Sequence, residues 1–334
     1  MGSEPNGDDA APLSPDEAFA AIGHEIRVGI LEALATTDRA DRPVPFSALR
    51  ERVGTVDSAK FNYHLDELVG HFVERTDEGY GFQPAGKRVA EAILSGAVTD
   101  DPVVELSRID ESCHYCGAPI EVTYRRERVA AYCPECDGTF GSSNVQDAEP
   151  AIPDEYGFLG NLDLPPAGVT DRTPSEIFAA AHTWSLADRL LAASDTCPRC
   201  AATFDEWIDV CGDHDREDGG CERCGNRYAV LHSASCTNCT FDQRVPFGLA
   251  LLDDARLQAF LTGHGINLVS PEYERYASAV MDYEETVLAG EPFEARFTFT
   301  AGGEAISLTV DDEFEVVDVV EHEAFRDGEE SAEP

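Results

Sequence analysis

The first hundred residues carry apolar side chains at helical spacing in three successive segments. This pattern predicts one or two helices between Asp16 and Thr36 with a break at Gly23, a short helix from Phe46 to Val53, and a third helix that begins near Ser58. The stripes are Phe19, Ile22, Ile26, Ile30 and Leu34, then Phe46, Leu49 and Val53, then Phe61, Leu65, Leu68 and Phe72. At about 100° per residue, Ala59 and Tyr63 fall on the face opposite the third stripe, and Lys60 and Asn62 lie at the two edges of that opposite face.

Later patterns mix strands and helices. FVERTDEGYGFQ predicts two short strands around a glycine-containing turn, and a helix is expected from Gly86 to Leu94. Thr173-Pro-Ser-Glu176 has the form of a capping box that opens a helix to about Ala193. The apolar stripe expected for that helix is Ile177, Ala181, Trp184, Ala187 and Leu191. GFLGNLDLPPAGVTDR, which precedes it, is interpreted as a Gly/Pro-rich connection.

The last third of the chain changes from helical to alternating patterns. An apolar segment PFGLALLDD, a helix near residues 254 to 262 and a helix starting at Pro271 are expected first. Strands follow, because apolar residues alternate on both sides of the Gly302-Gly303 turn, and Val316 to Val320 are expected to add an edge strand. The alternating residues are Phe293, Ala295, Phe297 and Phe299, then Ile306, Leu308 and Val310. This α+β end is compatible with effector binding, dimerisation or simple covering of the preceding segments.

Charge divides the chain unevenly. The formal net charge is -41, with 65 Asp and Glu against 24 Lys and Arg, and the only lysines are Lys60 and Lys87. Residues 1–18, 19–98 and 99–334 carry net charges of -5, -3 and -33, so both lysines lie in the stretch that is least acidic. Such a composition resembles proteins of salt-in halophilic archaea, whose carboxylates keep the surface hydrated. The alternative, an acidic disordered protein, is disfavoured by 43% hydrophobic residues and 17 Phe, 10 Tyr and 2 Trp.

No apolar run approaches the roughly 20 residues that span a bilayer, and the first residues lack the basic and apolar regions of a signal peptide. The expected location is therefore the cytoplasm, with no membrane contact.

The order of helices and hairpin in residues 16–96 resembles the ArsR-like winged helix-turn-helix transcription regulators. The matching segments are HEIRVGILEALA for the first core helix, PFSALRERVG for the positioning helix and SAKFNYHLDELVGHFVER for the recognition helix running into the wing. In this family the N-terminal half of the recognition helix enters the major groove of double-stranded DNA. The resemblance assigns that role here to Ser58, Ala59, Lys60, Asn62 and Tyr63.

Basic residues beyond that helix extend the expected DNA contact to Arg75, Lys87 and Arg88. His64 matches a histidine common in the family and is expected to pack or to contact a phosphate, with base reading as the alternative. Metal-sensing members place a cysteine pair in the positioning helix, whereas PFSALRERVG has none. Arsenic or cadmium sensing at that position is therefore not expected.

The eleven cysteines all follow Ser112, and ten of them form five C-x2-C pairs. Cys211 is followed at the same spacing by His214, so twelve ligands are present, enough for three structural zinc ions. Disulfides are the competing use, but C-x2-C pairs are better chelating knuckles than bridges in a reducing compartment. The first site is expected to combine Cys113 and Cys116 with Cys133 and Cys136 in a zinc ribbon. Its hairpin tip, residues 125–128, carries three arginines that fit either nucleic-acid contact or pairing with acids of the same chain.

The other ligands are Cys197, Cys200, Cys211, His214, Cys221, Cys224, Cys236 and Cys239, with spacers of ten, six and eleven residues between successive pairs. Two antiparallel strands of similar length would allow a nested pairing, with 211, 214, 221 and 224 at the tip and 197, 200, 236 and 239 at the base. Consecutive small ribbons are the alternative. Sets of four thiolates, or of three thiolates and one imidazole, leave no open coordination position, and motifs of common enzymes are absent from the sequence. An enzyme is therefore not expected.

The predicted fold is a multidomain α+β protein with an N-terminal winged helix-turn-helix, zinc-ribbon β-hairpins and an α+β C-terminal region. The expected segments are a disordered acidic tail (1–15), the winged domain (16–98), a zinc ribbon (105–145), a linker and helix (146–196), a double zinc-knuckle module (197–245), the α+β region (246–322) and an acidic tail (323–334). Three functions stay open at this point. They are an operator-reading homodimeric regulator, a basal factor that contacts the transcription machinery, as in archaeal transcription factor E, and a protein-interaction scaffold.

Overall fold

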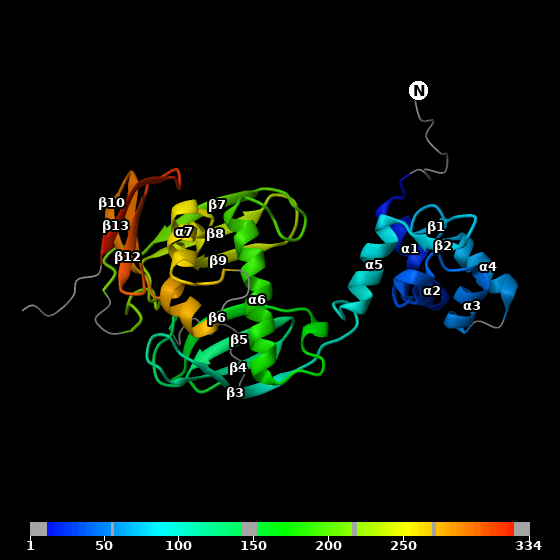
Figure 1. Cartoon of the computed structure of the whole chain (residues 1–334), viewed down its shortest axis with the longest axis horizontal. Helices are drawn as coiled ribbons and strands as arrows, with labels where there is room; N and C mark the ends of the chain where they lie inside the picture. Colours follow the sequence, from blue (N-terminus) through cyan, green and yellow to red (C-terminus); the bar gives the residue numbers. More distant parts are fainter. Residues whose placement is uncertain (1–11, 55–56, 142–151, 216–218, 269–271, 324–334) are drawn as a thin grey trace, which may run out of the picture. The chain divides into compact units, whose positions relative to one another are not determined.

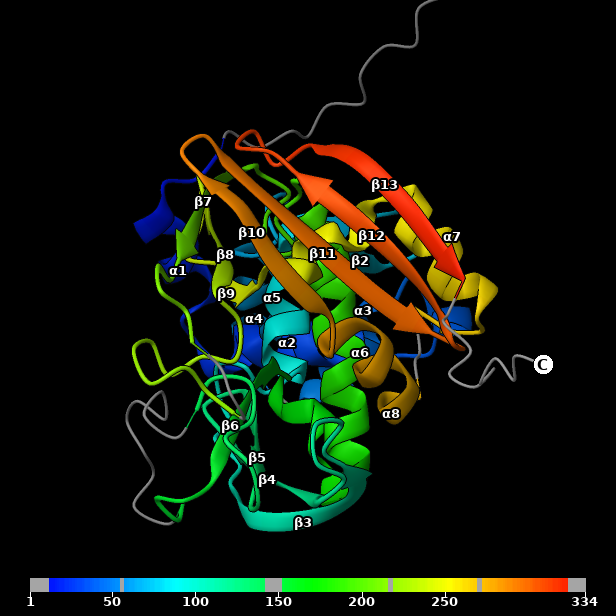
Figure 2. The same ribbon diagram turned by 90° about the vertical axis from the view of Figure 1, so that its left-hand side faces the viewer.

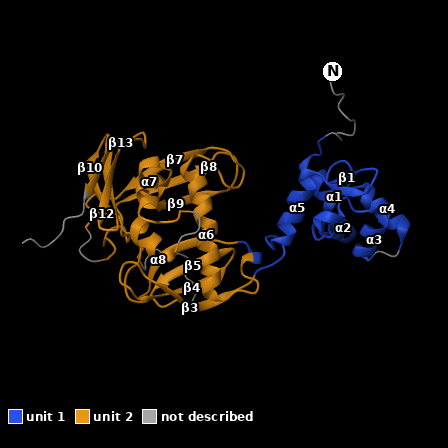
Figure 3. Ribbon diagram, viewed as in Figure 1, with its two compact units in different colours: residues 1–101, 165–167 blue, residues 102–164, 168–334 orange. Residues whose placement is uncertain are grey.

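The computed structural model describes residues 12–54, 57–141, 152–215, 219–268 and 272–323. The chain is a mixed α and β protein whose strands form antiparallel sheets, and it divides into two compact units (Figures 1 and 3). Unit 1 contains residues 1–101 and 165–167, and unit 2 contains residues 102–164 and 168–334. The two expected acidic tails lie outside the described residues, except for positions 12–15 and 323.

Unit 1 is built from helices and one small hairpin. Its elements are α1 (Pro15–Ile22), α2 (Glu25–Ala35), η1 (Arg39–Asp41), α3 (Phe46–Val53), α4 (Ser58–Asp66), β1 (Val73–Arg75), β2 (Tyr80–Phe82) and α5 (Pro84–Leu94). The predicted helices and strands are all present, with the break at Gly23. The third apolar stripe outlasts its helix, because α4 ends at Asp66 while Leu68 and Phe72 are buried in the segment that follows.

Local sequence signals explain where these helices begin. Ser14 and Glu17 form a capping box at α1, and the Asp57 carboxylate accepts hydrogen bonds from the first free amides of α4. α5 packs closely against the chain near Phe72, where a Cβ on Gly86 would lie 1.9 Å from the Phe72 carbonyl oxygen. Only glycine allows this approach.

The first sheet of unit 2 has four strands in sequential order. They are β3 (Val104–Ser112), β4 (Pro119–Arg125), β5 (Arg128–Cys133) and β6 (Gly157–Asp163). The expectation that GFLGNLDLPPAGVTDR is only a connection is wrong for its first seven residues, because β6 pairs with β5 along its whole length. Its glycines serve close packing: a Cβ on Gly157 would lie 2.0 Å from the Cys136 carbonyl oxygen. After β6 the chain does turn, through η3 (Pro166–Gly168).

The long helix α6 (Pro174–Ala193) begins at the predicted capping box of Thr173 and Glu176. Its buried face differs from the predicted stripe. Trp184 and Leu191 are each 45% exposed, and Ala187 is exposed as well. The residues that face the core are Ile177, Phe178, Ala181, His182, Ser185, Leu186 and Ala192. Ile177 and Ala181 are buried as predicted, but two polar residues occupy the interior where Trp184 was expected, so only part of the predicted stripe faces the core.

The second sheet of unit 2 has three strands, β7 (Phe204–Val210), β8 (Val230–Cys236) and β9 (Asp242–Pro246), with β8 in the centre. The expected apolar segment forms the 3-10 helix η4 (Phe247–Asp253), and α7 (Ala255–Gly263) follows as predicted. The helix expected from Pro271 is described from α8 (Tyr273–Tyr276), which continues as the π-helix η5 (Ala277–Met281); Pro271 itself lies outside the described residues.

The third sheet is a meander of β10 (Glu284–Gly290), β11 (Phe293–Ala301), β12 (Glu304–Val310) and β13 (Val316–Glu323). The three predicted strands are present, and β10 is an additional strand at the edge. Figure 2 shows this sheet face on, with α7 behind it. The alternating residues Phe297, Phe299 and Leu308 point into a core that α7, η4 and β8 complete.

Two cores hold unit 2 together. One lies between the first sheet and α6, and the other joins the second and third sheets through η4 and α7. The region 105–322, which the sequence divides into four segments, therefore belongs to one compact unit apart from residues 165–167. In the part of the chain that the structure describes, no helix has the length and apolarity needed to cross a bilayer.

Candidate metal centres and DNA-facing surface

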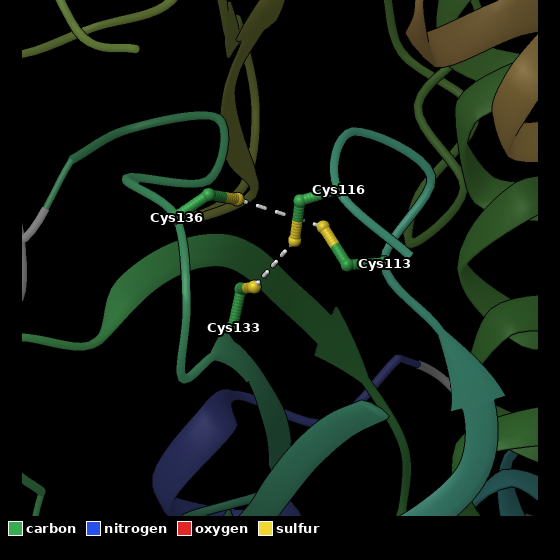
Figure 4. A group of neighbouring side chains, drawn as sticks. All are labelled: Cys113, Cys116, Cys133 and Cys136. Carbon is green, nitrogen blue, oxygen red and sulfur yellow. Dashed lines mark hydrogen bonds between the residues drawn. The ribbon is translucent and has the colours of Figure 1, made fainter. Parts of the chain in front are cut away.

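The first cluster, centre A, consists of Cys113, Cys116, Cys133 and Cys136 (Figure 4). Cys113 follows β3 and Cys133 ends β5, so adjacent regions of the first sheet bring the two knuckles together. The Sγ atoms of Cys113 and Cys136 are 3.7 Å apart, and those of Cys116 and Cys133 are 3.4 Å apart. Cys113 and Cys133 are buried, and Cys116 is exposed.

The second cluster, centre B, and the third, centre C, lie at opposite ends of the β7–β8 ladder. Centre B consists of Cys197, Cys200, Cys236 and Cys239, and centre C consists of Cys211, His214, Cys221 and Cys224. β7 and β8 pair from Phe204 with Cys236 to Val210 with Val230. This is the nested grouping, and the alternative of consecutive ribbons does not fit the structure.

The knuckles share one backbone pattern. In centre A the Gly117 amide donates to the Cys113 carbonyl, and the Cys113 amide donates to the Ala118 carbonyl. The same two bonds recur at the knuckles that begin with Cys197 and Cys221. The residue after the second cysteine has a left-handed backbone in each case, with φ of 77° at Gly117, 60° at Ala201 and 73° at Gly225. Glycine suits this turn, and Ala201 adopts it at a steric cost.

The donor set fits a tetrahedral metal ion better than disulfides. The closest sulfur pairs in centres A and B are 3.4 to 3.7 Å apart, whereas a disulfide needs about 2.05 Å. With metal–sulfur bonds of about 2.3 Å, the edges of a tetrahedron would measure about 3.8 Å. In every cluster the four ligand atoms lie within 4.8 Å of one another. The three groups can therefore each hold one ion.

In centre C the imidazole of His214 has the surroundings of a metal ligand. Its Nδ1 lies 3.6 Å from the Cys224 Sγ, and its Nε2 lies 3.2 Å from the carbonyl oxygen of Arg227. A histidine that binds a metal through one nitrogen usually donates a hydrogen bond from the other, which fixes the ring. The Arg227 carbonyl supplies that acceptor.

Thiol acidity in centre A also favours a cation. Hydrogen bonding with Cys113 and Cys136 lowers the pKa of Cys133, and the bond to Cys133 raises the pKa of Cys113. The neighbouring thiols thus stabilise one thiolate, at Cys133, whereas a second thiolate in the cluster would be repelled by the first. A divalent ion removes that repulsion and allows all four sulfurs to ionise.

The eight residues that the sequence assigned to DNA contact are all on the surface of unit 1: Ser58, Ala59, Lys60, Asn62, Tyr63, Arg75, Lys87 and Arg88. Tyr63 is 59% exposed, while Phe61 and Leu65 on the opposite side of α4 are fully buried. His64 is buried and its ring lies 3.9 Å from that of His24, so it packs rather than faces solvent.

Asp66, near the end of α4, is a neighbour of this surface. Its carboxylate accepts from the Asn62 amide at 2.6 Å and from the Arg75 guanidinium at 3.1 Å. Arg75 also donates to the Tyr80 hydroxyl. One carboxylate thus joins the α4 surface to the β1–β2 hairpin. Lys87 is engaged too, 3.6 Å from the Glu91 carboxylate.

The arginines at the β4–β5 turn are largely paired within unit 2. Arg125 contacts Glu105 at 3.1 Å, and Arg128 contacts Asp163 at 3.7 Å. This arrangement agrees with a solvated turn that pairs with acids of the same chain. The sequence could not reveal either partner, because Asp163 is 35 residues away on a strand that was not predicted.

The fold and sites define a two-unit α+β protein with three cysteine-rich metal-ligand clusters. Residues 110–316 match the family described as Domain of unknown function (DUF7351), and the chain belongs to that family. Residues 15–93 match Domain of unknown function (DUF7347). The second range lies within unit 1, and the first lies within unit 2 except for residues 165–167. No curated protein and no solved structure matches the chain.

Proposed function

We propose that the protein is a DNA-binding transcription regulator of a halophilic archaeon, in which unit 1 is an ArsR-like winged helix-turn-helix and unit 2 is stabilised by three structural zinc ions. Unit 1 has the element order that this fold requires: a core helix α2, a positioning helix α3, a recognition helix α4 and the wing β1–β2. The protein would bind a palindromic operator as a homodimer in the cytoplasm.

The observation that carries the DNA-binding proposal is the two-sidedness of α4. Phe61 and Leu65 anchor it in the core, while Lys60 and Tyr63 project from the opposite surface. Lysine is nearly absent from the rest of the chain, so its presence on this surface supports contact with a polyanion. Lys60 makes no ion pair with any other residue that the structure describes, so its charge is available to a phosphate or a base edge.

Asp66 refines the proposal. A protein that reads bases must hold amide and guanidinium groups in a fixed orientation, and Asp66 does so for Asn62 and Arg75. Its negative charge also lies close to where DNA phosphates would be. DNA binding by this surface therefore needs screening of that carboxylate, which molar salt provides.

Zinc is proposed because the ligand sets are rich in thiolates, which soft and borderline ions prefer, and because the four ligand atoms of each set lie close enough together to share one ion. When bound, zinc supplies folding free energy and no reactive centre. Cys113, Cys116, Cys133 and Cys136 would hold one ion, and centres B and C one each.

The test is genome-wide immunoprecipitation of the tagged protein, followed by binding measurements on the enriched sequences. Discrete operators support the proposal. Enrichment at all active promoters would instead indicate a basal factor, and no enrichment would indicate a scaffold. On a recovered site, Lys60→Ala and Tyr63→Ala should each cost about 1 to 3 kcal/mol of binding. Arg223→Ala is the control, since Arg223 is exposed in unit 2 and pairs with Asp213.

A further inference from the structure

Centres A and C are far apart in the sequence, yet one residue contacts both. Arg227 follows the last knuckle of centre C, and its carbonyl oxygen holds the His214 imidazole. Its side chain reaches centre A instead. The guanidinium carbon lies 3.7 Å from the ring centroid of Tyr115, a residue inside the first knuckle, and Nε donates to the Gly138 carbonyl at 3.1 Å.

The backbone of Arg227 reinforces this link. Its amide donates to the Thr139 carbonyl at 2.8 Å, just after the second knuckle of centre A. Tyr115 is fixed in turn, because its hydroxyl lies 3.2 Å from the Thr139 hydroxyl and contacts the Met281 carbonyl. Both partners of the cation–π contact are half-buried, so the contact is partly shielded from solvent.

A second bridge lies beside the first. The Asp137 carboxylate accepts from the Gly220 amide at 3.1 Å, immediately before Cys221. The two loops approach so closely that a Cβ on Gly141 would lie 2.4 Å from the Gly225 carbonyl oxygen. The loop after each of these knuckles is thus part of the surroundings of the other centre.

We propose that metal binding at centres A and C is cooperative and that Arg227 is the positioning residue that couples them. The inference rests on the proposed metal binding. An ion at centre A orders the Tyr115 and Gly138 loops, which then hold Arg227 and the His214 imidazole in place. An ion at centre C orders Arg227 and thereby raises the metal affinity of centre A by the same factor, since coupling between two binding sites is reciprocal.

Centre B supplies an internal comparison. Its Arg199 contacts Asp163 and Asp188, on β6 and α6, and pairs with no described residue in the loops of centre A or C. Its occupancy should therefore respond to Arg227 far less than the occupancy of the other two centres.

The experiment uses the full chain loaded with ¹¹³Cd²⁺, whose NMR resonances separate the three-sulfur, one-nitrogen centre C from the four-sulfur centres A and B. Ligand variants assign the two four-sulfur resonances. Competition with a chelator then gives the affinity of each centre. In the otherwise unchanged protein, Cys224→Ser should empty centre C and lower the affinity of centre A by about 10-fold. In an Arg227→Ala background, Cys224→Ser should lower the affinity of centre A clearly less, because the backbone bonds of residue 227 and the Asp137 bridge remain.

Two variants provide controls. Arg223→Ala removes an arginine of the same loop that binds Gly212 and Asp213, and it should leave both affinities unchanged. Asp137→Asn weakens the second bridge without touching Arg227, and it should reduce the coupling while the chain stays folded by circular dichroism. If Cys224→Ser leaves centre A unchanged while all three centres bind metal in the unmodified protein, the coupling is wrong and the metal proposal stands. If no ¹¹³Cd resonance is seen, both are wrong.

Discussion

The imidazole of His182 stands edge-on to the ring of Tyr276, with 5.0 Å between the ring centroids and 77° between the planes. Both residues are buried, and Tyr273 and Phe178 also pack against the imidazole. Burial, followed by the charge of Arg189, lowers the pKa of His182 to about 4. The fold therefore requires the neutral imidazole at this position.

This pKa shift predicts how stability depends on pH. The folded pKa lies below the unfolded value of 6.5, so the unfolded chain binds the proton more tightly. The contribution is complete above pH 6.5 and is lost as the pH falls toward 4, by about 3 kcal/mol at most. Denaturant unfolding at constant salt should show a smaller loss between pH 7 and pH 5 in His182→Phe than in the unmodified protein. Equal losses would place the acid sensitivity elsewhere.

Metal removal should affect the two units differently. The purified protein should hold close to three zinc ions per chain, one for each cluster. Chelation should destabilise unit 2, which contains all three clusters, and leave unit 1 folded, because unit 1 contains none of these clusters and has its own core. Elemental analysis gives the stoichiometry, and amide signals of residues 12–101 report the state of unit 1. A content of one ion or none, with thiols oxidised to disulfides, contradicts the metal centres.

Ala201 offers a prediction about the knuckles alone. It adopts a left-handed backbone with φ of 60°, which costs a non-glycine residue about 1 to 2 kcal/mol. Ala201→Gly should therefore stabilise unit 2 by roughly 0.5 to 1 kcal/mol, once the greater freedom of glycine in the unfolded chain is subtracted. Gly117→Ala should have the opposite effect, since φ is 77° there and no atom lies within 4 Å of an added Cβ. Thermal unfolding of the zinc-loaded protein measures both.

Two phenylalanines of unit 1 allow the loss of a buried ring to be compared with the loss of an exposed one. Phe61 is fully buried, and Phe61→Ala should destabilise unit 1 by about 3 to 5 kcal/mol because the truncation leaves a cavity. Phe19 is 72% exposed, so Phe19→Ala removes the same atoms with little effect on the free energy of unfolding. Similar losses in the two variants would mean that α4 is not anchored by Phe61.

Salt dependence tests the link between charge and DNA binding. Most DNA-binding proteins lose affinity steeply as salt rises, because bound phosphates release counterions. Residues 19–98 carry twelve acids and nine bases, and Asp66 lies beside Asn62 and Arg75. Affinity for an operator should therefore fall weakly, or rise, between moderate and molar KCl. Binding that is abolished by a few tenths molar KCl contradicts adaptation to concentrated salt.

The sequence by itself determined the elements whose signals are local. Period 3.6 gave the helices of unit 1, the Thr173–Glu176 capping box gave the start of α6, and C-x2-C spacing gave all twelve candidate ligands. These features depend on interactions between residues only a few positions apart, so a short segment of sequence is enough to predict them. The nested grouping of centres B and C was also within reach, because two spacers of similar length indicate paired strands.

Only the tertiary structure decided which distant surfaces meet. β6 is a strand because β5 offers it hydrogen bonds, although its glycines are typical of a connection. α6 buries Phe178 and His182 rather than Trp184 because the aromatic rings of Tyr273 and Tyr276 complete that side of the core. Arg227 joins centres A and C through Tyr115, 112 residues away, and a lone arginine carries no sequence signal for such a partner. The local conformations open to such a segment differ little in free energy. Contacts between distant residues decide which one is adopted, and these contacts form only when the chain folds.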